Sequence, residues 1–336
     1  MKIIFKQILI AVSVAFFLFT AAACTKTPLG SENATTSLVP SASLTEKGDV
    51  VVASGSLGGT WYPFGESVGM AIKNAGYTYT NIPGGGNSNI IAVSTGEADI
   101  GLTMTTSMGM AAEGSPEFKG IKYENVSAVL RLFDDPLHIL VAADSKIESI
   151  ADLKGKKIGI ATAGQLSETV ALDALKVYGI DEKDVDLQRG TPSDHTTLYK
   201  DGHIDAWLYI MMPPSSQAMD MAISKPSKML SIEDGDVEKF EEIRKGYSMS
   251  VIPAGTYKGI DYDVKCINTD VVLIVSDDKS EEEVYDMVKA LVEGREAFGD
   301  ALSSMKGVTP EQLAAIADGV KIHPGALKYF KEQGLK

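Results

Sequence analysis

The sequence of 336 residues is poor in the side chains that form covalent cross-links and metal sites. Two cysteines are present, Cys24 and Cys266, which is too few for a disulfide framework or a cysteine metal site. The four histidines are scattered without the spacing of metal ligands, at His138, His195, His203 and His323. We therefore expect no metal and no cofactor, and a fold that is stabilised by its hydrophobic core alone.

Basic residues are also scarce relative to acidic ones. Lys and Arg number 31 against 45 Asp and Glu, which gives a net charge of −14 at pH 7. Nucleic acids are bound mainly through Lys and Arg that neutralise phosphates, so this balance argues against a nucleic-acid partner. An excess of negative charge is better interpreted as an aid to solubility than as a guide to the ligand.

Common catalytic motifs are missing as well. The chain has no G-x-S-x-G elbow, no P-loop and no H-E-x-x-H. Ser303 to Lys306 matches S-x-x-K, but it precedes a turn and lies away from the predicted strand ends. We therefore expect a binding protein and not an enzyme. A secreted hydrolase remains the alternative, and the one nucleophile and base set that can be assembled for it is Ser88 with Asp194 and His195.

One apolar run is present near the N-terminus, from Ile8 to Phe19, and no second long run follows it. Lys2 and Lys6 flank its start and three alanines end it, which is the pattern of a secretory signal. The run is shorter than the about 20 apolar residues of a comfortable membrane span. Cys24 directly after the alanines resembles the lipidated cysteine of a bacterial lipobox. An ordinary signal peptide cut at the same place is the alternative.

These features predict how the chain is located. Residues 1–23 are predicted to be the signal peptide, and 24–48 a flexible tether after the lipidated Cys24. The tether prediction depends on a composition rich in Ser, Thr and Ala, with scattered prolines and no apolar periodicity. We expect an extracytoplasmic monomer, periplasmic or at the cell surface, held to the membrane by its lipid.

From Asp49 onward, short apolar runs, Gly-containing loops and helical patterns alternate, as in parallel α/β units. Two stretches repeat this order at nearly equal spacing, 40 positions from Gly59 to Asp99 and 41 from Gly164 to Asp205. Each ends in Gly-x-x-Asp followed by a further strand. The repeat predicts two lobes of one architecture that face each other across a cleft. The general similarity of all βαβ units is the alternative explanation.

The two lobes are predicted to share the chain unequally. Lobe 1 is predicted at residues 49–142 and 256–336, and lobe 2 at 143–255. Each lobe is expected to hold a doubly wound sheet. Since the chain passes from lobe 1 to lobe 2 and back, two crossings would form a hinge, and hinge bending is the expected motion.

The loops after the strands are the predicted ligand site. In open α/β sheets, ligands bind outside the carboxyl ends of the strands, where helix N-termini offer backbone N–H groups to a carboxylate or phosphate. The candidates lie on these loops and on the adjacent helix starts and strands: Thr60, Trp61, Tyr62, Asn87, Ser88, Asn89, Thr105, Gly164, Gln165, Ser167, Trp207 and Met211. Packing in the core is the alternative role for the aromatic residues and for the methionine.

Several short blocks carry a family resemblance. Gly58-Gly59-Thr60-Trp61-Tyr62-Pro63 resembles the GGTYYP start of the TAXI solute-binding proteins, which serve TRAP-type transporters. Further blocks follow in the family's order: Gly85 to Asn89, Gly96 to Asp99, Asp152 to Lys156, Gly202 to Ala206, and Pro253 to Tyr257. The resemblance covers the chain after the tether. It implies a periplasmic-binding-protein fold and delivery of a small carboxylate, such as glutamate or 2-oxoglutarate, to an ion-driven permease.

The chain also departs from the family's pattern. Gln165 and Leu166 stand where relatives often have Ser and Gly, and Met104 stands near a position where relatives place Gln. Met211 to Pro214 replaces a smaller turn that contains Gly. A more apolar pocket than the family's is therefore predicted, which rejects ligands whose polar groups would be left unpaired. A sensor that docks on a membrane kinase is the second functional alternative, since solute binding and closure would be the same.

Overall fold

The computed structural model describes residues 47–57 and 60–336. The predicted signal peptide, Cys24 and the predicted tether up to residue 46 lie outside these residues, as do Gly58 and Gly59. The first strand begins at Gly48, at the end of the predicted tether. No helix within the described ranges has the length and apolar character needed to cross a membrane.

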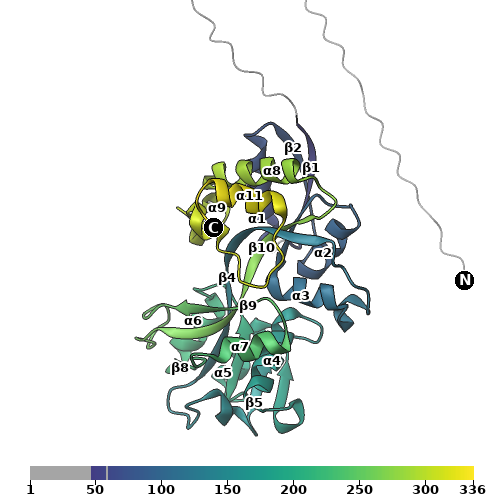
Figure 1. Ribbon diagram of the computed structural model, residues 1–336. Helices are drawn as coiled ribbons and strands as arrows, with labels where there is room; N and C mark the ends of the chain where they lie inside the picture. Colours follow the sequence, from purple (N-terminus) through teal and green to yellow (C-terminus); the bar gives the residue numbers. More distant parts are fainter. Residues whose placement is uncertain (1–46, 58–59) are drawn as a thin grey trace, which may run out of the picture. The chain divides into compact units, whose positions relative to one another are not determined.

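Lobe 1 is a sheet with helices packed on it. Its strands follow the order β2-β1-β3-β10-β4, in which β1 is parallel to β2 and β3 while β10 is antiparallel to its neighbours. The strands are β1 (Gly48–Ala53), β2 (Tyr77–Ile82), β3 (Ile100–Met104), β4 (Val126–Ala142) and β10 (Val264–Ser276). The helices are α1 (Trp61–Lys73), α2 (Gly86–Ser94), α3 (Thr105–Glu113), α8 (Glu281–Glu293), α9 (Glu296–Ala301), α10 (Pro310–Ala314) and α11 (Pro324–Glu332) (Figure 1).

Lobe 2 repeats this plan on the far part of β4, with the strand order β4-β7-β5-β6. Two further strands pair with the crossing strands, β8 with β4 and β9 with β10. The strands are β5 (Lys157–Ile160), β6 (Asp186–Arg189), β7 (Ala206–Ile210), β8 (Ser227–Met229) and β9 (Tyr247–Ile252). The helices are α4 (Leu166–Val177), α5 (Pro192–Lys200), α6 (Ser216–Ser224) and α7 (Asp236–Ile243). Short 3-10 turns lie at Pro116–Phe118, Ile150–Leu153, Glu182–Asp184 and Ser303–Met305.

The two aspartates that end the repeated stretches have the same role in both lobes. The carboxylate of Asp99 accepts a hydrogen bond from the Val51 amide at 2.8 Å, and that of Asp205 accepts one from the Lys157 amide at 2.9 Å. Each aspartate thereby fixes the third strand of its unit beside the first. The predicted two-lobed α/β fold with two doubly wound sheets is therefore confirmed.

Burial along the strands follows their position in the sheets. Every residue of β7 is buried, and so is the stretch of β10 from Ile267 to Ser276, because helices cover both faces of these central strands. The strands at the edges, β2 and β6, are only partly buried. Apolar runs, Ala206–Ile210 in β7 and 271–275 in β10, therefore mark these central strands in the sequence, whereas residues 268–270 of β10 are buried although they are polar.

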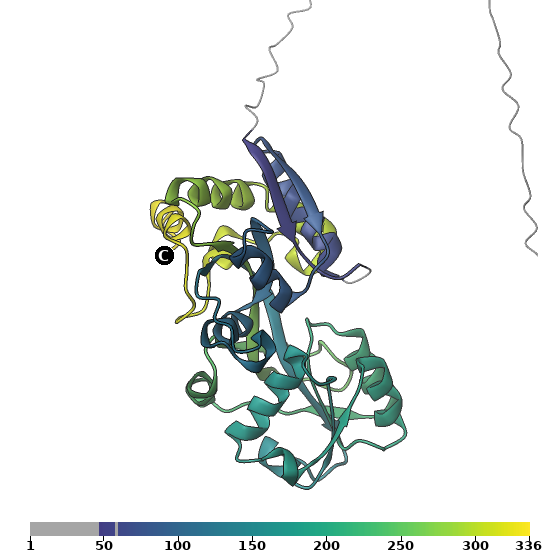
Figure 2. The same ribbon diagram turned by 90° about the vertical axis from the view of Figure 1, so that its right-hand side faces the viewer.

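Two long strands, β4 and β10, pass from one lobe to the other (Figure 2). They are paired with each other from Val126–Ser276 to Pro136–Asn268. The hydrophobic cores divide within them, since Phe133 belongs to the core of lobe 1 and Leu137 to that of lobe 2. The first predicted lobe boundary, 142/143, lies after this division, at the end of β4, and the second, 255/256, lies before the return crossing in β10, just after β9. The crossings are therefore parts of a sheet and not separate linkers.

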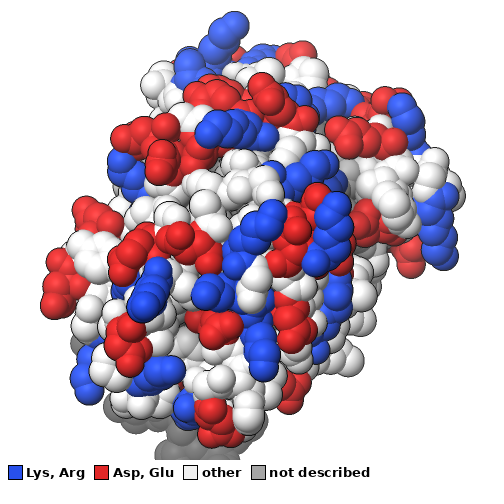
Figure 3. Space-filling model, turned by 90° about the horizontal axis from the view of Figure 1, so that it is seen from below, with Lys and Arg blue, Asp and Glu red and all other residues white. Residues whose placement is uncertain are grey.

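The surface of the described residues carries both signs of charge. On the face seen in Figure 3, acidic and basic side chains are interspersed. This face therefore offers no continuous basic surface to a phosphate backbone.

Candidate functional site

A cavity of about 590 Å³ lies between the lobes beside the crossing strand β4. Lobe 1 contributes the loops after β1 and β2, lobe 2 contributes the segment after β7, and β4 contributes two side chains. The lining residues are Gly55, Ser56, Thr60, Trp61, Gly84, Gly85, Phe133, Asp135, Ile210, Met211, Met212, Pro214, Ser215, Ser216 and Gln217. All three segments follow the carboxyl ends of strands that pair in parallel, which is where ligands bind in such sheets.

Each of these three segments leads into a helix. The cavity therefore meets the N-termini of α1, α2 and α6, whose first backbone N–H groups have no partner within the helix. Side-chain caps occupy few of these groups: Ser215 accepts a hydrogen bond from the Ala218 amide, and α1 and α2 have no side-chain cap. An anion in the cavity could accept hydrogen bonds from the remaining N–H groups.

The two loops of lobe 1 are held by one buried side chain, Asn89. Its Nδ2 donates to the carbonyl oxygens of Ser54 and Leu102 at 2.6 and 2.7 Å, and its Oδ1 accepts from the Gly85 amide at 3.1 Å. A Cβ atom on Gly84 would lie 2.0 Å from Oδ1 of Asn89, so the close approach requires glycine. Asn89 thus positions the cavity wall from behind and does not line it.

The lobe 2 segment is held by a buried pair, His138 and Tyr257. His138 Nδ1 lies 3.1 Å from the Pro136 carbonyl oxygen, and Nε2 lies 2.7 Å from the Tyr257 hydroxyl. Burial lowers the pKa of His138 to about 4, so the ring is neutral at pH 7. Nδ1 then donates to Pro136 and Nε2 accepts from Tyr257. The same hydroxyl accepts from the Ser215 amide at 2.9 Å, which ties the start of α6 to the crossing strand.

Asp135 is the one ionisable side chain in the described lining of the cavity. Its amide donates to Asn268 Oδ1 at 2.9 Å, but its carboxylate accepts no hydrogen bond from the described residues. Some of its surface is open to the cavity, while protein surrounds the rest. Burial, followed by repulsion from Asp134, raises the pKa of Asp135 to about 7. The sequence interpretation missed this residue, although two adjacent aspartates inside an apolar strand are a visible signal.

The remaining wall is largely apolar, formed by Trp61, Phe133, Ile210, Met211 and Met212. Met212 follows a lobe 2 strand, yet it packs against the core of lobe 1. Leu166, at the start of α4, packs against the cores of both lobes. Met104, at the end of β3, also packs against both cores, so three of the apolar departures from the family's pattern lie at contacts between the lobes.

The predicted site residues fall into two groups, of which the first lies at the cavity. Thr60, Trp61 and Met211 line it. Tyr62, Asn87 and Ser88 lie in the first turns of α1 and α2, outside the lining. Ser88 is exposed, and its hydroxyl donates to the Gly85 carbonyl oxygen at 3.0 Å.

The second group makes contacts within the protein. Thr105 donates to the Gly246 carbonyl oxygen at 2.5 Å, and Ser167 accepts from the amide of Ile210 at 3.0 Å. Gln165 is exposed and accepts from the Tyr209 hydroxyl, while the amide of Gly164 donates to Glu168. Trp207 has no exposed surface and stacks on Tyr209 at 5.6 Å between ring centroids. With Asn89, described above, these are six further predicted residues that the structure does not bring to the cavity lining.

The hydrolase alternative needs Ser88, Asp194 and His195 together. Asp194 accepts hydrogen bonds from Thr191 at the start of α5, and the buried His195 lies 2.9 Å through Nε2 from the Gln188 carbonyl oxygen. None of the hydrogen bonds within the described ranges joins either residue to Ser88. Their contacts are those of a helix cap and a packed core residue.

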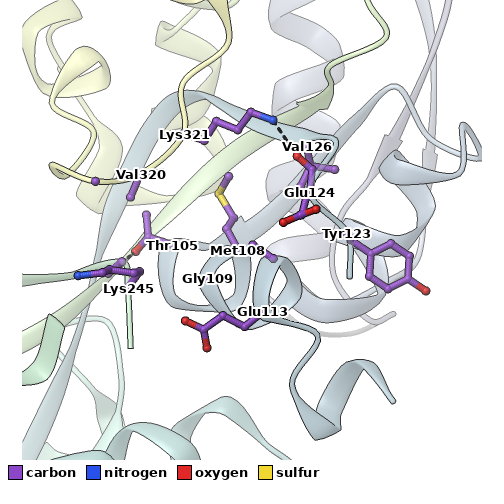
Figure 4. A pocket seen from close by; sticks show the side chains of 13 residues that line it. Thr105, Met108, Gly109, Glu113, Tyr123, Glu124, Val126, Lys245, Val320 and Lys321 are labelled. Carbon is purple, nitrogen blue, oxygen red and sulfur yellow. Dashed lines mark hydrogen bonds between the residues drawn. The ribbon is translucent and has the colours of Figure 1, made fainter. Parts of the chain in front are cut away.

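A second cavity, of about 360 Å³, lies along the flank of α3 (Figure 4). Its cationic groups already have partners: Lys321 Nζ donates to the Glu124 carbonyl oxygen at 2.7 Å, and Lys245 pairs with Glu241 at 3.6 Å. Its lining includes Thr105, whose hydroxyl is used by Gly246. The cavity beside β4, with its helix N-termini and its unpaired carboxylate, is therefore the candidate site. In the described part of the chain, no cluster of His, Cys, Asp and Glu could hold a metal ion.

Comparison with known proteins identifies a family that this chain matches. The NMT1-like family matches residues 52–334, which is most of the chain. A curated protein of Escherichia coli (strain K12), described as an aliphatic sulfonates-binding protein, is 38% identical over 69 residues. That match spans 20% of this chain and 21% of the relative, so it covers about a fifth of either protein.

Solved structures share the fold. A TctC solute binding protein from Polaromonas aligns with a TM-score of 0.53 at 18% identity, over 86% of this chain and 98% of that protein. The periplasmic aliphatic sulphonate binding protein of Escherichia coli aligns with a TM-score of 0.44 at 17% identity, over 76% of this chain and 79% of that protein. At such identities the likeness to the Polaromonas protein shows the fold alone, that of the two-lobed periplasmic solute-binding proteins.

Proposed function

The chain belongs to the NMT1-like family, and we propose that it is an extracytoplasmic receptor that captures a small solute between its lobes and delivers it to a membrane permease. The observation that carries the proposal is the cavity beside β4, to which both lobes contribute. Its volume of about 590 Å³ is in the range of small-molecule sites, roughly 300–1,000 Å³. We propose that this cavity binds the solute and does not catalyse a reaction.

The solute is proposed to carry a carboxylate. Three helix N-termini meet the cavity, and they favour an anion through their N–H groups and dipoles. The described lining contains no Lys or Arg, so backbone groups and hydroxyls would supply the binding energy. A sulfonate satisfies the same groups, and an Escherichia coli relative is described as sulfonates-binding, so sulfonates belong in any test.

Capture is proposed to occur by closure of the lobes about the crossing strands. Met212 and Leu166 support this because each contacts the core of lobe 1 from a lobe 2 segment. Apolar contacts of this kind would stabilise the closed form once a solute excludes water from the cavity. The hydrogen-bonded pairing of β4 with β10 would keep the motion to a bend between two rigid lobes.

The partner is proposed to be a TRAP-type permease, with the receptor acting as a monomer held to the membrane through lipid on Cys24. The ordered blocks from Gly58 to Tyr257 support the transporter type, and the signal pattern supports the anchor. A membrane kinase is the competing partner. Deletion of the gene should abolish uptake of the identified solute if the partner is a permease, whereas loss of a transcriptional response with normal uptake would favour the kinase.

Binding itself is tested by tryptophan fluorescence and thermal unfolding of the full chain in detergent. The sequence has two tryptophans, of which Trp61 lines the cavity and Trp207 is buried in lobe 2. A panel of carboxylates, sulfonates, amino acids and sugars should contain one class that changes the fluorescence of Trp207→Phe, which retains Trp61. At about 100 times its Kd that class should add roughly 2.7 kcal/mol to the unfolding free energy.

The matched variant Trp61→Phe retains the buried Trp207 and reports whether the signal arises in the cavity. We expect the same solute to leave its fluorescence nearly unchanged. A solute that altered Trp207 alone would place binding elsewhere. If no compound of the panel changes the fluorescence or the thermal unfolding of either variant, the proposed receptor function is contradicted.

A further inference from the structure

We propose that Asp135 receives an ammonium group of the solute, so that the cavity selects zwitterionic solutes over simple acids. The acidic group of such a solute, carboxylate or sulfonate, would lie at the helix N-termini, and its amine at the crossing strand. This inference rests on the proposed function, because it assigns the chemistry of the solute bound in the same cavity.

The first reason is the contrast between two adjacent aspartates on β4. The carboxylate of Asp134 is used within the protein: it pairs with Arg131 and accepts from the Ser250 hydroxyl at 2.7 Å. The carboxylate of Asp135, one residue later, lines the cavity and accepts nothing from the described residues. Successive side chains of a strand point to opposite faces, which explains why Asp134 contacts protein groups while Asp135 faces the cavity.

The second reason is that the nearby cation is already engaged. Arg131 contacts both Asp134 and Asp270, and its Nε lies 3.0 Å from Asp270 Oδ1. The charged groups around Asp135 on the crossing strands are therefore two carboxylates and one guanidinium shared between them. Asp135 is left without a counter-ion, and a partly buried charge without one is costly. A ligand ammonium would remove that cost on binding.

The third reason is the position of Asp135 relative to the anion site. Its backbone is fixed, because its amide donates to Asn268 Oδ1 on β10 at 2.9 Å. The helix N-termini lie on the loops that form the rest of the lining. A simple acid would bring a second negative charge into a cavity that holds one already. A zwitterion would place its acidic group at the helix N-termini and its ammonium group at the Asp135 carboxylate.

A protonated Asp135 that donates to a ligand carboxylate is the competing arrangement, and the effect of pH separates the two. Burial and Asp134 raise the pKa of Asp135 to about 7, so both protonation states are accessible. An ammonium needs the ionised form, hence its affinity should rise several-fold between pH 6 and pH 8. A bond from the protonated form predicts the reverse, and that result would overturn the inference.

The test measures binding to the full chain by calorimetry with matched sets that differ only in charged groups. The sets are each of the common amino acids with its deaminated acid, and taurine with ethanesulfonate. We expect one zwitterion to bind at least tenfold more tightly than its deaminated partner. Asp135→Asn should remove this preference by weakening the zwitterion and not the acid, while Asp134→Asn should retain it.

The outcomes also separate this inference from the proposed function. An acid that binds as tightly as its zwitterion, or an Asp135→Asn protein with an unchanged preference, overturns the inference and leaves a solute receptor. If no zwitterion binds but a sugar or simple acid does, the result is the same. If nothing in the panel binds, both fail. The wild-type comparison and its pH dependence need no variant, so a folding defect in Asp135→Asn cannot obscure the result.

Discussion

The guanidinium Nε of Arg131 lies 3.0 Å from Oδ1 of Asp270, and this ion pair joins the two strands that pass between the lobes. Asp270 is 2% exposed, and Asn268 Nδ2 also donates to it, at 2.8 Å. Burial raises the pKa of Asp270, whereas the charge of Arg131 acts in the opposite direction. The crossing is therefore held by a buried carboxylate that depends on a single guanidinium.

Replacement of Arg131 by Met should destabilise the protein strongly. The change keeps an apolar stem but leaves Asp270 buried without its cation, which typically costs about 3–5 kcal/mol. Urea denaturation at pH 7 measures the loss. The double variant Arg131→Met/Asp270→Asn removes the uncompensated charge and should recover at least half of it. A loss below about 1 kcal/mol in the single variant would show that the pair does not stabilise the crossing.

Asn89→Ala should also destabilise the protein, by about 2–4 kcal/mol. The change leaves two carbonyl oxygens and one amide without their partner, and each buried polar group left unpaired costs about 1–3 kcal/mol before local relaxation. Thermal unfolding measures the effect. Ser88→Ala, at the adjacent exposed position, is the matched control and should change stability by less than about 0.5 kcal/mol. Equal effects of the two changes would contradict the assigned role of Asn89.

These two neighbours show what the sequence can and cannot predict. The sequence predicts a Gly-rich loop followed by a helix near residues 84–89, because turn and cap residues have local preferences, and the structure has this order with the helix beginning at Gly86. Which of Ser88 and Asn89 turns inward depends on the packing of α2 against β1 and β3, which no local pattern contains. Both were therefore named as ligand residues, and the structure buries Asn89 behind the loop.

The same distinction applies to the rest of the molecule. Asp99 and Asp205 were found by their spacing, since the repeated unit places the same backbone contact in each lobe. Trp207 was named as an aromatic near the cleft, but the central position of β7 covers it on both faces. Asp135 was missed because its exposure depends on where β4 crosses between the lobes. Local spacing thus predicts the elements, whereas cavity lining depends on contacts between distant segments.

Asp135→Asn should stabilise the ligand-free protein at neutral and alkaline pH. Because the pKa of Asp135 is raised to about 7, the folded state binds a proton that the unfolded state has lost between about pH 4 and 7. The wild-type protein therefore loses stability as pH rises through this window, and the amide variant does not. We expect a gain of about 2 kcal/mol above pH 7 and almost none at pH 4. This gain is about half of what the pKa shift alone would give, because Asp135 is partly open to solvent.

Denaturation at a series of pH values measures this difference. Asp134→Asn carries the same change one residue away, but it removes one of the two carboxylate partners of Arg131 and the acceptor of the Ser250 hydroxyl, so it should destabilise the protein at neutral pH. The two neighbouring variants are thus expected to differ in sign. A gain for Asp135→Asn that does not depend on pH would show that the carboxylate does not titrate in this window.

Tyr257→Phe should weaken both stability and solute binding. The hydroxyl accepts from the Ser215 amide and donates to neutral His138, so its removal leaves two buried polar groups unpaired, at a cost of about 2–3 kcal/mol. Ser215 lines the cavity and is the N-cap of α6, so a looser attachment should also lower solute affinity several-fold. Tyr262→Phe removes a hydroxyl that contacts Met229, outside the cavity lining, and should lower stability without changing affinity. Unchanged affinity in Tyr257→Phe, with stability lost, would restrict the pair to a structural role and remove α6 from the binding site.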